Sequence, residues 1–235
     1  MKRGRDPIEY NKDAWVFWLH SISRETMAGA QKMDEYFRTF TAHFGEPRGR
    51  RSAPVSSIEK YRSKLPDALL SVWQSEGWGA YADGLFWIVD PDQYTATLKQ
   101  WLSGSDLEHV DNYHVIARDA FGSLYAWGEH YQRSITISSL AGGIVALKSQ
   151  LQQRQTNPDR ALGIFFATAT KADFDFEDRM GNPLFERALA KLGPLLESEM
   201  YAFEPALSLG GRADLDGLVK VDMDVHLALL DQFRR

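Results

Sequence analysis

The stretch that decides the fold is LPDALLSVWQSEGWGAYADGLFWIVDPDQYTATLKQW, which spans residues 65–101. Pro66 and Asp67 are typical of a helix start, because the N–H that proline lacks would be unpaired there and the helix dipole favours an acidic first turn. The apolar residues that follow recur at spacings of three and four, which predicts one buried helical face. These residues are Leu69, Val72 and Trp73. Gly77 is expected to end the helix.

The second half of this stretch predicts a buried strand followed by another helix. Residues 85–89 read LFWIV, a short run rich in aromatic and β-branched side chains, which indicates a strand buried on both faces. Asp90 and Pro91 then predict a helix start, with a capping side chain and a proline at the first helical position. Before the strand, Gly79 is expected to keep the chain irregular. The buried face of the second helix is expected to contain Tyr94, Leu98, Trp101 and Leu102.

Outside this stretch, strands are expected in the middle of the chain and a mixture of helices and strands near its end. The basic run RGRR at residues 48–51 is expected to form a solvated loop. Strands expected at 113–117, 124–127 and 135–137 are joined by short turns, which indicates an antiparallel meander. The later elements are helices opening at Asn157-Pro158 and Asn182-Pro183, strands at 200–203 and 218–221, and a helix at 226–233. We therefore expect an α+β fold of two coupled domains, each a small, mainly antiparallel sheet with packed helices.

Several of these features together resemble the GAD-like domain of bacterial immunity proteins that neutralise type VI secretion DNase effectors. The matching residues are Leu65-Pro66-Asp67, Leu69-Leu70, Trp73, Gly77-Trp78, Gly84-Leu85-Phe86-Trp87, Asp90-Pro91, Trp101-Leu102, Tyr113 to Arg118, Ala120-Phe121-Gly122 and Trp127-Gly128. They are helix starts, turns and core aromatics, so the resemblance indicates a family and carries no catalytic signature.

The last third of the chain carries a second resemblance, to the C-terminal domain that accompanies the GAD-like domain in these immunity proteins. The matching residues are Asn182-Pro183-Leu184-Phe185, Ala188-Leu189, Lys191 to Leu195, Glu199-Met200-Tyr201, Phe203, Pro205-Ala206-Leu207, Leu209-Gly210-Gly211 and His226 to Leu230. The two resemblances follow the order of the family. We therefore divide the chain into an N-terminal extension at 1–33, a GAD-like domain at 34–147 and an immunity C-terminal domain at 148–235.

The first 32 residues differ from the rest, because they are basic while the remainder is acidic. Their apolar run at 15–19, WVFWL, is too short for the core of a signal peptide. Two expectations stay open: a helix that packs these aromatics on the body of the protein, or an extension upstream of a natural start at Met33. The resemblance begins near Met33, which favours the second, whereas the aromatics that such an extension would expose favour the first.

The composition describes a folded, acidic chain without cysteine. The sequence has 235 residues and is 44% hydrophobic, and the absence of cysteine excludes disulfides, thiolate metal sites and a cysteine nucleophile. The net charge is −5, and residues 33–235, with 21 basic and 28 acidic residues, carry −7. Such a surface repels DNA and anionic membranes and favours a basic partner. The absence of cysteine fits a reducing cytoplasm, which is where we expect the protein. No run reaches the roughly 18 apolar residues of a membrane span.

The clearest pattern for an enzyme is the acidic run DFDFED at residues 173–178. Asp173, Asp175 and Glu177 could bind Mg²⁺ or Ca²⁺, which take oxygen ligands, and would then serve a metal-dependent hydrolase. The glycine and closing glutamate that an EF-hand loop needs at set spacing are missing. We favour a solvated acidic turn with its two phenylalanines packed beneath it, which can also face a basic partner.

Catalytic and cofactor motifs are missing elsewhere in the sequence. The six histidines show no metal-site spacing, and neither a strained nucleophile turn nor a phosphate-binding loop occurs. We therefore expect no catalytic residue, no metal and no cofactor, and hence a protein that is not an enzyme. A ligand-sensing regulatory module stays open beside the hydrolase, and metal titration would separate the hydrolase from the other hypotheses.

The resemblance implies an immunity protein that binds a cognate toxin, with a basic nuclease domain as the partner, and blocks its active site. Aromatic and acidic side chains are expected at the contact, because aromatics dominate interface hot spots and carboxylates complement a basic cleft. The residues expected there are Trp78, Tyr81, Asp83, Asp90, Asp92, Asp173, Asp175 and Glu177. Direct contacts with nucleic acid or a membrane are not expected.

Overall fold

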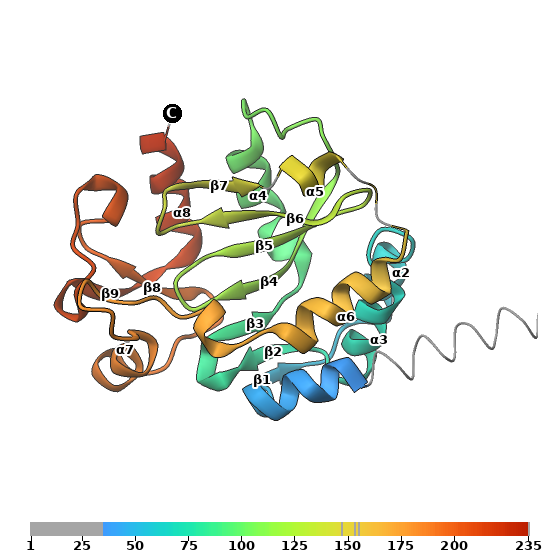
Figure 1. Ribbon diagram of the computed structural model, residues 1–235, viewed down its shortest axis with the longest axis horizontal. Coiled ribbons are helices and arrows are strands. Elements are labelled where there is room, and N and C mark those ends of the chain that lie inside the picture. The colour runs from blue at the N-terminus through green and yellow to red at the C-terminus, as the bar shows by residue number, and fades with distance from the viewer. Residues whose placement is uncertain (1–34, 147, 153, 155, 235) are drawn as a thin grey trace, which may run out of the picture.

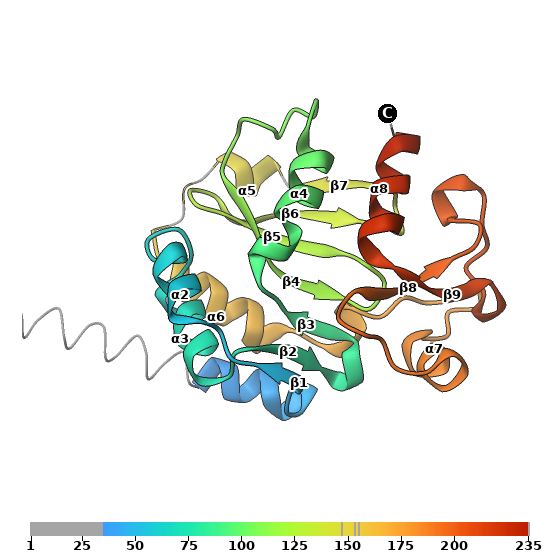
Figure 2. The same ribbon diagram turned by 180° about the vertical axis from the view of Figure 1, so that it is seen from behind.

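The protein folds around two antiparallel sheets with helices packed on both faces of the larger one (Figures 1 and 2). The computed structural model describes residues 35–146, 148–152, 154 and 156–234. The two alternatives for the first 32 residues concern a part of the chain outside the described residues, so both stay predictions. In the described part, one sheet has seven strands and the other has two, which confirms the predicted α+β class with antiparallel sheets.

The seven strands of the large sheet follow one another in sequence order, and each pairs with the next in antiparallel fashion. They are β1 (Arg48–Arg51), β2 (Trp78–Tyr81), β3 (Phe86–Ile88), β4 (Tyr113–Asp119), β5 (Leu124–Gly128), β6 (Gln132–Ser138) and β7 (Gly143–Ala146). The buried strand expected at 85–89 and the meander expected from residue 113 onward are both confirmed.

Two predictions were wrong, because residues 48–51 and 78–81 form strands and not loops. Strand β1 is exposed along its whole length, so its sequence shows no alternation of apolar and polar residues that would indicate a strand. Gly79 allows β1 to approach: a Cβ there would lie 3.1 Å from the Pro47 Cβ and 3.2 Å from the Arg48 carbonyl oxygen. The glycine therefore permits close strand pairing where we expected it to break regular structure.

The helices match the predicted starts only in part, because those predicted from residues 66, 158 and 183 begin within two residues of these points, whereas those predicted from residues 91 and 226 begin at Thr95 and Met223. They are a helix over residues 35–44, α2 (Val55–Tyr61), α3 (Asp67–Ser75), α4 (Thr95–Leu102), α5 (Lys148–Gln152), α6 (Pro158–Thr168), α7 (Phe185–Leu192) and α8 (Met223–Arg234). The Asp90 carboxylate accepts a hydrogen bond from the Asp92 N–H, and the Asn157 side chain accepts one from the Arg160 N–H, as N-caps do. The first opens a 3₁₀ turn, η2 (Pro91–Tyr94), before α4.

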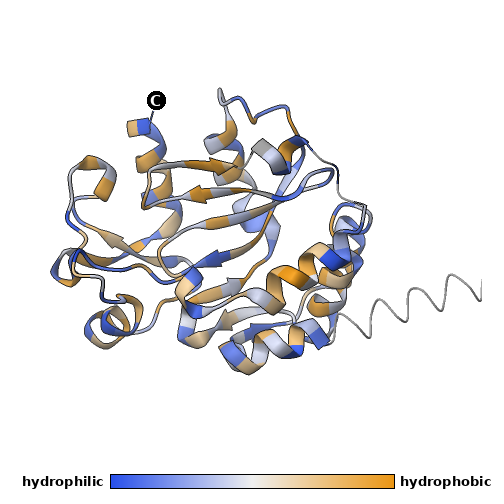
Figure 3. Ribbon diagram, viewed as in Figure 1, coloured by the Kyte–Doolittle hydropathy of each residue, from blue (hydrophilic) through white to orange (hydrophobic). Residues whose placement is uncertain are grey.

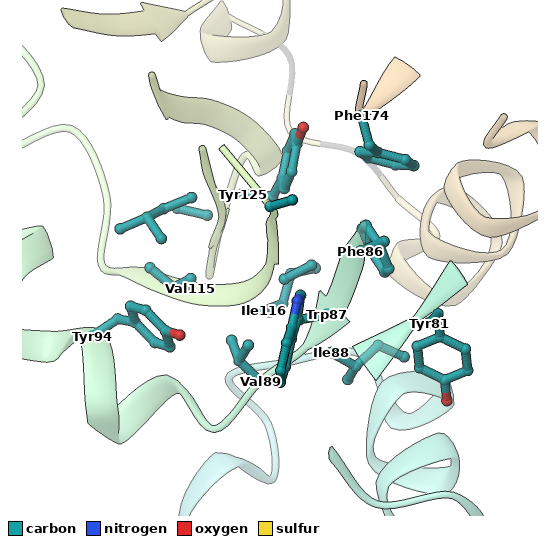
Figure 4. Close-up of a cluster of buried hydrophobic side chains, with 14 of the residues drawn as sticks. Tyr81, Phe86, Trp87, Ile88, Val89, Tyr94, Val115, Ile116, Tyr125 and Phe174 are labelled. Atoms are coloured by element: carbon teal, nitrogen blue, oxygen red, sulfur yellow. The ribbon is translucent and has the colours of Figure 1, made fainter. Parts of the chain in front are cut away.

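Hydrophobic residues of the strands and helices (Figure 3) include a cluster of aromatic rings that packs between the large sheet and the helices on one face (Figure 4). Phe86 of β3 lies 5.4 Å from Phe40, between ring centroids, and 4.6 Å from Phe174, which also lies 5.4 Å from Tyr125. Phe40 comes from the first helix of the described chain and Phe174 from the C-terminal half. The two halves therefore share one hydrophobic core.

The C-terminal half also packs on the other face of the large sheet through α8 (Figure 2). Its small sheet consists of β8 (Glu199–Phe203) and β9 (Leu218–Asp222). The Trp101 indole N–H of α4 donates to the Leu227 carbonyl at 3.2 Å, and Thr97 donates to Asp224 at 3.1 Å. The division of the chain at 147/148 stays a prediction. No helix in the described ranges has the length and apolar character needed to cross a membrane.

Candidate partner-binding site

Residues 171–177, which we call the seam segment, cross the large sheet and connect it to the C-terminal half. The segment begins in a 3₁₀ turn, η3 (Lys171–Asp173), and ends at a β-bridge between Glu177 and Pro183. Phe174 is buried, and the Phe176 ring lies 6.3 Å from that of Phe121. The expected acidic turn with two phenylalanines packed beneath it is therefore present.

Two of the three seam carboxylates stabilise the backbone. Asp173 accepts hydrogen bonds from the N–H and the hydroxyl of Thr170, both at 2.8 Å, and so completes a capping box. Asp175 accepts from the N–H groups of Phe176, Leu184 and Phe185 at the start of α7. Among the described residues, no three His, Cys, Asp or Glu side chains are placed to hold a common metal ion.

Beside the seam segment lies a pocket of about 300 Å³, which we call the acidic pocket. Its walls come from the seam segment, from α7 and from the turn η1 (Ala82–Gly84) between β2 and β3. The apolar part of the lining is Ala82, Leu85, Ala172, Pro183, Phe185 and Leu189, and the charged part is Asp83, Lys171, Asp175, Glu177 and Glu186. Four carboxylates and one ammonium group give this lining a net charge of −3.

The carboxylates of the acidic pocket differ in how they are bonded. Asp83 forms an ion pair with Arg48 at 2.6 Å. Burial and the nearby Glu186 carboxylate raise the pKa of Asp175, although its backbone hydrogen bonds act in the opposite direction. Glu177 and Glu186 are exposed, and in the part of the chain that the structure describes neither side-chain carboxylate has a hydrogen-bond or ion-pair partner. These two groups are therefore available to a partner.

A strained turn places Asp83 at the rim of the acidic pocket. Ala82 has φ 48° and Asp83 has φ 60°, values in the left-handed region that cost side-chain-bearing residues energy. The turn is fixed from both sides, since its flanking strands pair from Gly79 opposite Ile88 to Tyr81 opposite Phe86. The η1 wall of the pocket is therefore a rigid feature of the β2–β3 hairpin.

The seam segment also borders a second pocket, of about 380 Å³, with Asp119 in its lining. The Asp119 carboxylate accepts hydrogen bonds at 2.9 Å from the Phe121 N–H, the Ser123 N–H and the Tyr125 hydroxyl. Burial raises the pKa of Asp119 to about 6. This carboxylate holds the turn between β4 and β5, and our reading of the sequence missed it.

Arg118, the neighbour of Asp119 in β4, is fully buried on the opposite face of the sheet. Its guanidinium carbon lies 4.1 Å from the centre of the Trp87 ring, and it donates to the carbonyl oxygens of Leu196 at 3.4 Å and Glu197 at 3.0 Å. Burial lowers the pKa of Arg118. Both residues could have been identified as unusual from the sequence, because two adjacent charged residues end a mostly apolar strand.

The other residues expected at a partner contact do not join the acidic pocket. Trp78 and Tyr81 are 3% and 0% exposed, so their rings belong to the core of this structure, and a role for them at a partner contact stays a prediction. Asp90 and Asp92 follow the far end of β3, where Asp92 accepts hydrogen bonds from Lys60 and Tyr61. Of the eight expected residues, the structure brings Asp83, Asp175 and Glu177 together in the acidic pocket.

Two family models match the chain in sequence order. A GAD-like domain matches residues 35–141, and the C-terminal domain of the type VI secretion immunity protein Tdi1 matches residues 159–234. The crystal structure of Atu4351 from Agrobacterium tumefaciens is similar in fold, with a TM-score of 0.73 and 24% sequence identity over 83% of this chain and 88% of that one. Among curated proteins, none matches the sequence significantly.

Proposed function

This chain belongs to the type VI secretion immunity proteins that join a GAD-like domain to a Tdi1 C-terminal domain, and we propose that it binds and neutralises a DNase toxin. The observation that carries the proposal is the ordered pair of domain matches, at 35–141 and 159–234. Binding of this kind takes place in the cytoplasm, where a delivered nuclease would reach DNA, and the chain itself catalyses no reaction.

The charge of the chain supports a basic nuclease as the partner. A DNase must attract a polyanion, so its cleft is positively charged, and an acidic protein complements that cleft. Residues 33–235 carry a net charge of −7. Occupation of the cleft by this chain would keep DNA from the catalytic residues of the toxin.

The test is protection of growing cells from the toxin encoded beside this chain. Co-expression of the two proteins should restore growth that the toxin alone abolishes, and the purified proteins should form a stable complex. A catalytically inactive toxin variant serves as the control for binding without toxicity. Cells that die despite abundant folded immunity protein would contradict the proposed function.

A further inference from the structure

The lining of the acidic pocket is complementary to one basic side chain. Its floor is apolar, with Leu85 from the end of the β2–β3 turn and Leu189 from α7, and its lining carries four carboxylates. Glu177 stands on the seam segment and Glu186 in the first turn of α7, so the two free carboxylates come from separate walls. A partner group held between them would contact both walls at once.

The lining excludes most other occupants. Its net charge of −3 repels anions, and among the described residues no three of its carboxylates are arranged around a common cation. An arginine side chain fits both parts of the pocket, because its methylene stem can lie on the apolar floor while its planar guanidinium meets carboxylates in a forked geometry. A lysine ammonium is more strongly hydrated and offers no such fork.

We propose that the acidic pocket binds an arginine side chain of the toxin, with Glu177 and Glu186 as its charge partners. The proposal rests on the proposed function and adds the place and the chemistry of one anchor. Arginine is enriched among the residues that dominate interface energies, and such anchors sit in preformed pockets. Arg48 pairs with Asp83, and Lys171 is the one cation in the lining itself, so the other three carboxylates still outnumber the positive charge beside them.

The first experimental arm needs no toxin. We would titrate the full-length protein with N-acetyl-arginine amide and follow the methyl resonances of Leu85 and Leu189 by NMR. N-acetyl-citrulline amide, which has nearly the same shape without the charge, is the matched ligand control. The arginine compound should shift these resonances in the millimolar range, and citrulline should not.

Variants then assign the binding to the two glutamates. Glu177→Gln combined with Glu186→Gln should weaken arginine-amide binding about tenfold, because both exposed ion pairs with the guanidinium are lost. Asp106→Asn removes one charge from an exposed site outside the pocket and should leave binding unchanged. Equal shifts with arginine and citrulline, no shift with either, or unchanged binding in the double variant would each overturn the proposal.

The second arm uses the nuclease domain of the toxin encoded beside this chain. The same double variant should weaken the complex at least tenfold, and Asp106→Asn should not. If the parent protein binds the toxin and the double variant binds it equally well, the proposed arginine site is wrong and the proposed function stands. If the parent protein binds no toxin, the proposed function fails, while the arginine-amide titration still decides the chemistry of the pocket.

Discussion

Arg118 and Asp119 are adjacent charged residues of β4 that lie on opposite faces of the sheet, and both are buried. Arg118 links β4 to the segment before β8 through the Leu196 and Glu197 carbonyls. Asp119 holds the next turn of the same sheet through Phe121. At the scale of single residues, Arg118 therefore connects the GAD-like part of the chain to the C-terminal half. Asp119 stabilises the turn between β4 and β5.

Loss of Arg118 should destabilise the whole protein. Arg118→Ala removes the packing against Trp87 and the hydrogen bond to the Glu197 carbonyl oxygen, so the free energy of unfolding should fall by about 3–5 kcal/mol. Arg118→Met keeps most of the packing and should cost about 1–3 kcal/mol. Urea denaturation measures both. An alanine variant within 1 kcal/mol of the parent would contradict the linking role.

Asp119 should make stability depend on pH in the mildly acidic range. Its folded pKa of about 6 lies above the ordinary aspartate pKa of 3.8, so the folded protein binds the proton more tightly than the unfolded chain does. The resulting stabilisation is fully present below about pH 4 and is lost as the pH rises through 6, with a size on the order of 3 kcal/mol. Asp119→Asn should remove this component from urea denaturation curves measured between pH 4 and 7. A parallel pH profile in the variant would count against the assignment.

At the scale of elements, the seam segment combines supporting carboxylates with free ones. Asp175 accepts hydrogen bonds from the N–H of Phe176 and from two N–H groups at the start of α7, whereas the Glu177 carboxylate, two residues later, has no bonded partner within the described ranges. The same short run therefore contains groups needed for folding and groups available for binding.

Substitutions in the seam segment should separate these two roles. Asp175→Ala leaves the N–H groups of Phe176 and Phe185 without their acceptor and should lower the free energy of unfolding by about 1–3 kcal/mol. Glu177→Gln should change it by less than about 0.5 kcal/mol, as exposed substitutions usually do. Thermal denaturation of both variants gives the comparison. Equal midpoints for the two variants would show that Asp175 has no such structural role.

Elements with their own start signals or buried apolar runs could be predicted from the sequence. Asp90 and Asn157 cap helices, and the run at 85–89 is a buried strand, because these signals are local. Strand β1 could not be predicted, since its exposed arginines carry no pattern and its pairing depends on β2, about 30 residues away. The acidic pocket was predicted only in part, because Glu186 approaches Asp83 and Glu177 through tertiary packing alone.

At the scale of the whole molecule, charge should control how fast the partners meet. The negative charge of this chain should attract a positively charged nuclease. Salt screens this attraction beyond the Debye length, which is about 8 Å at physiological ionic strength. Stopped-flow association should therefore slow about tenfold or more from low to high salt. Dissociation should change much less, because apolar contacts at the interface are not screened. An association rate independent of salt would contradict electrostatic steering.

The central claim is that this chain neutralises a nuclease by binding it directly, and titration of DNA cleavage tests that claim most directly. Increasing amounts of the purified protein would be added to a fixed amount of the purified toxin nuclease domain, and the cleaved DNA would be measured. We predict that cleavage falls in proportion to the added protein and ends near one equivalent, as nanomolar binding, about −12 kcal/mol, requires. The protein alone should leave DNA intact. Cleavage that persists in the presence of excess folded protein would contradict the account.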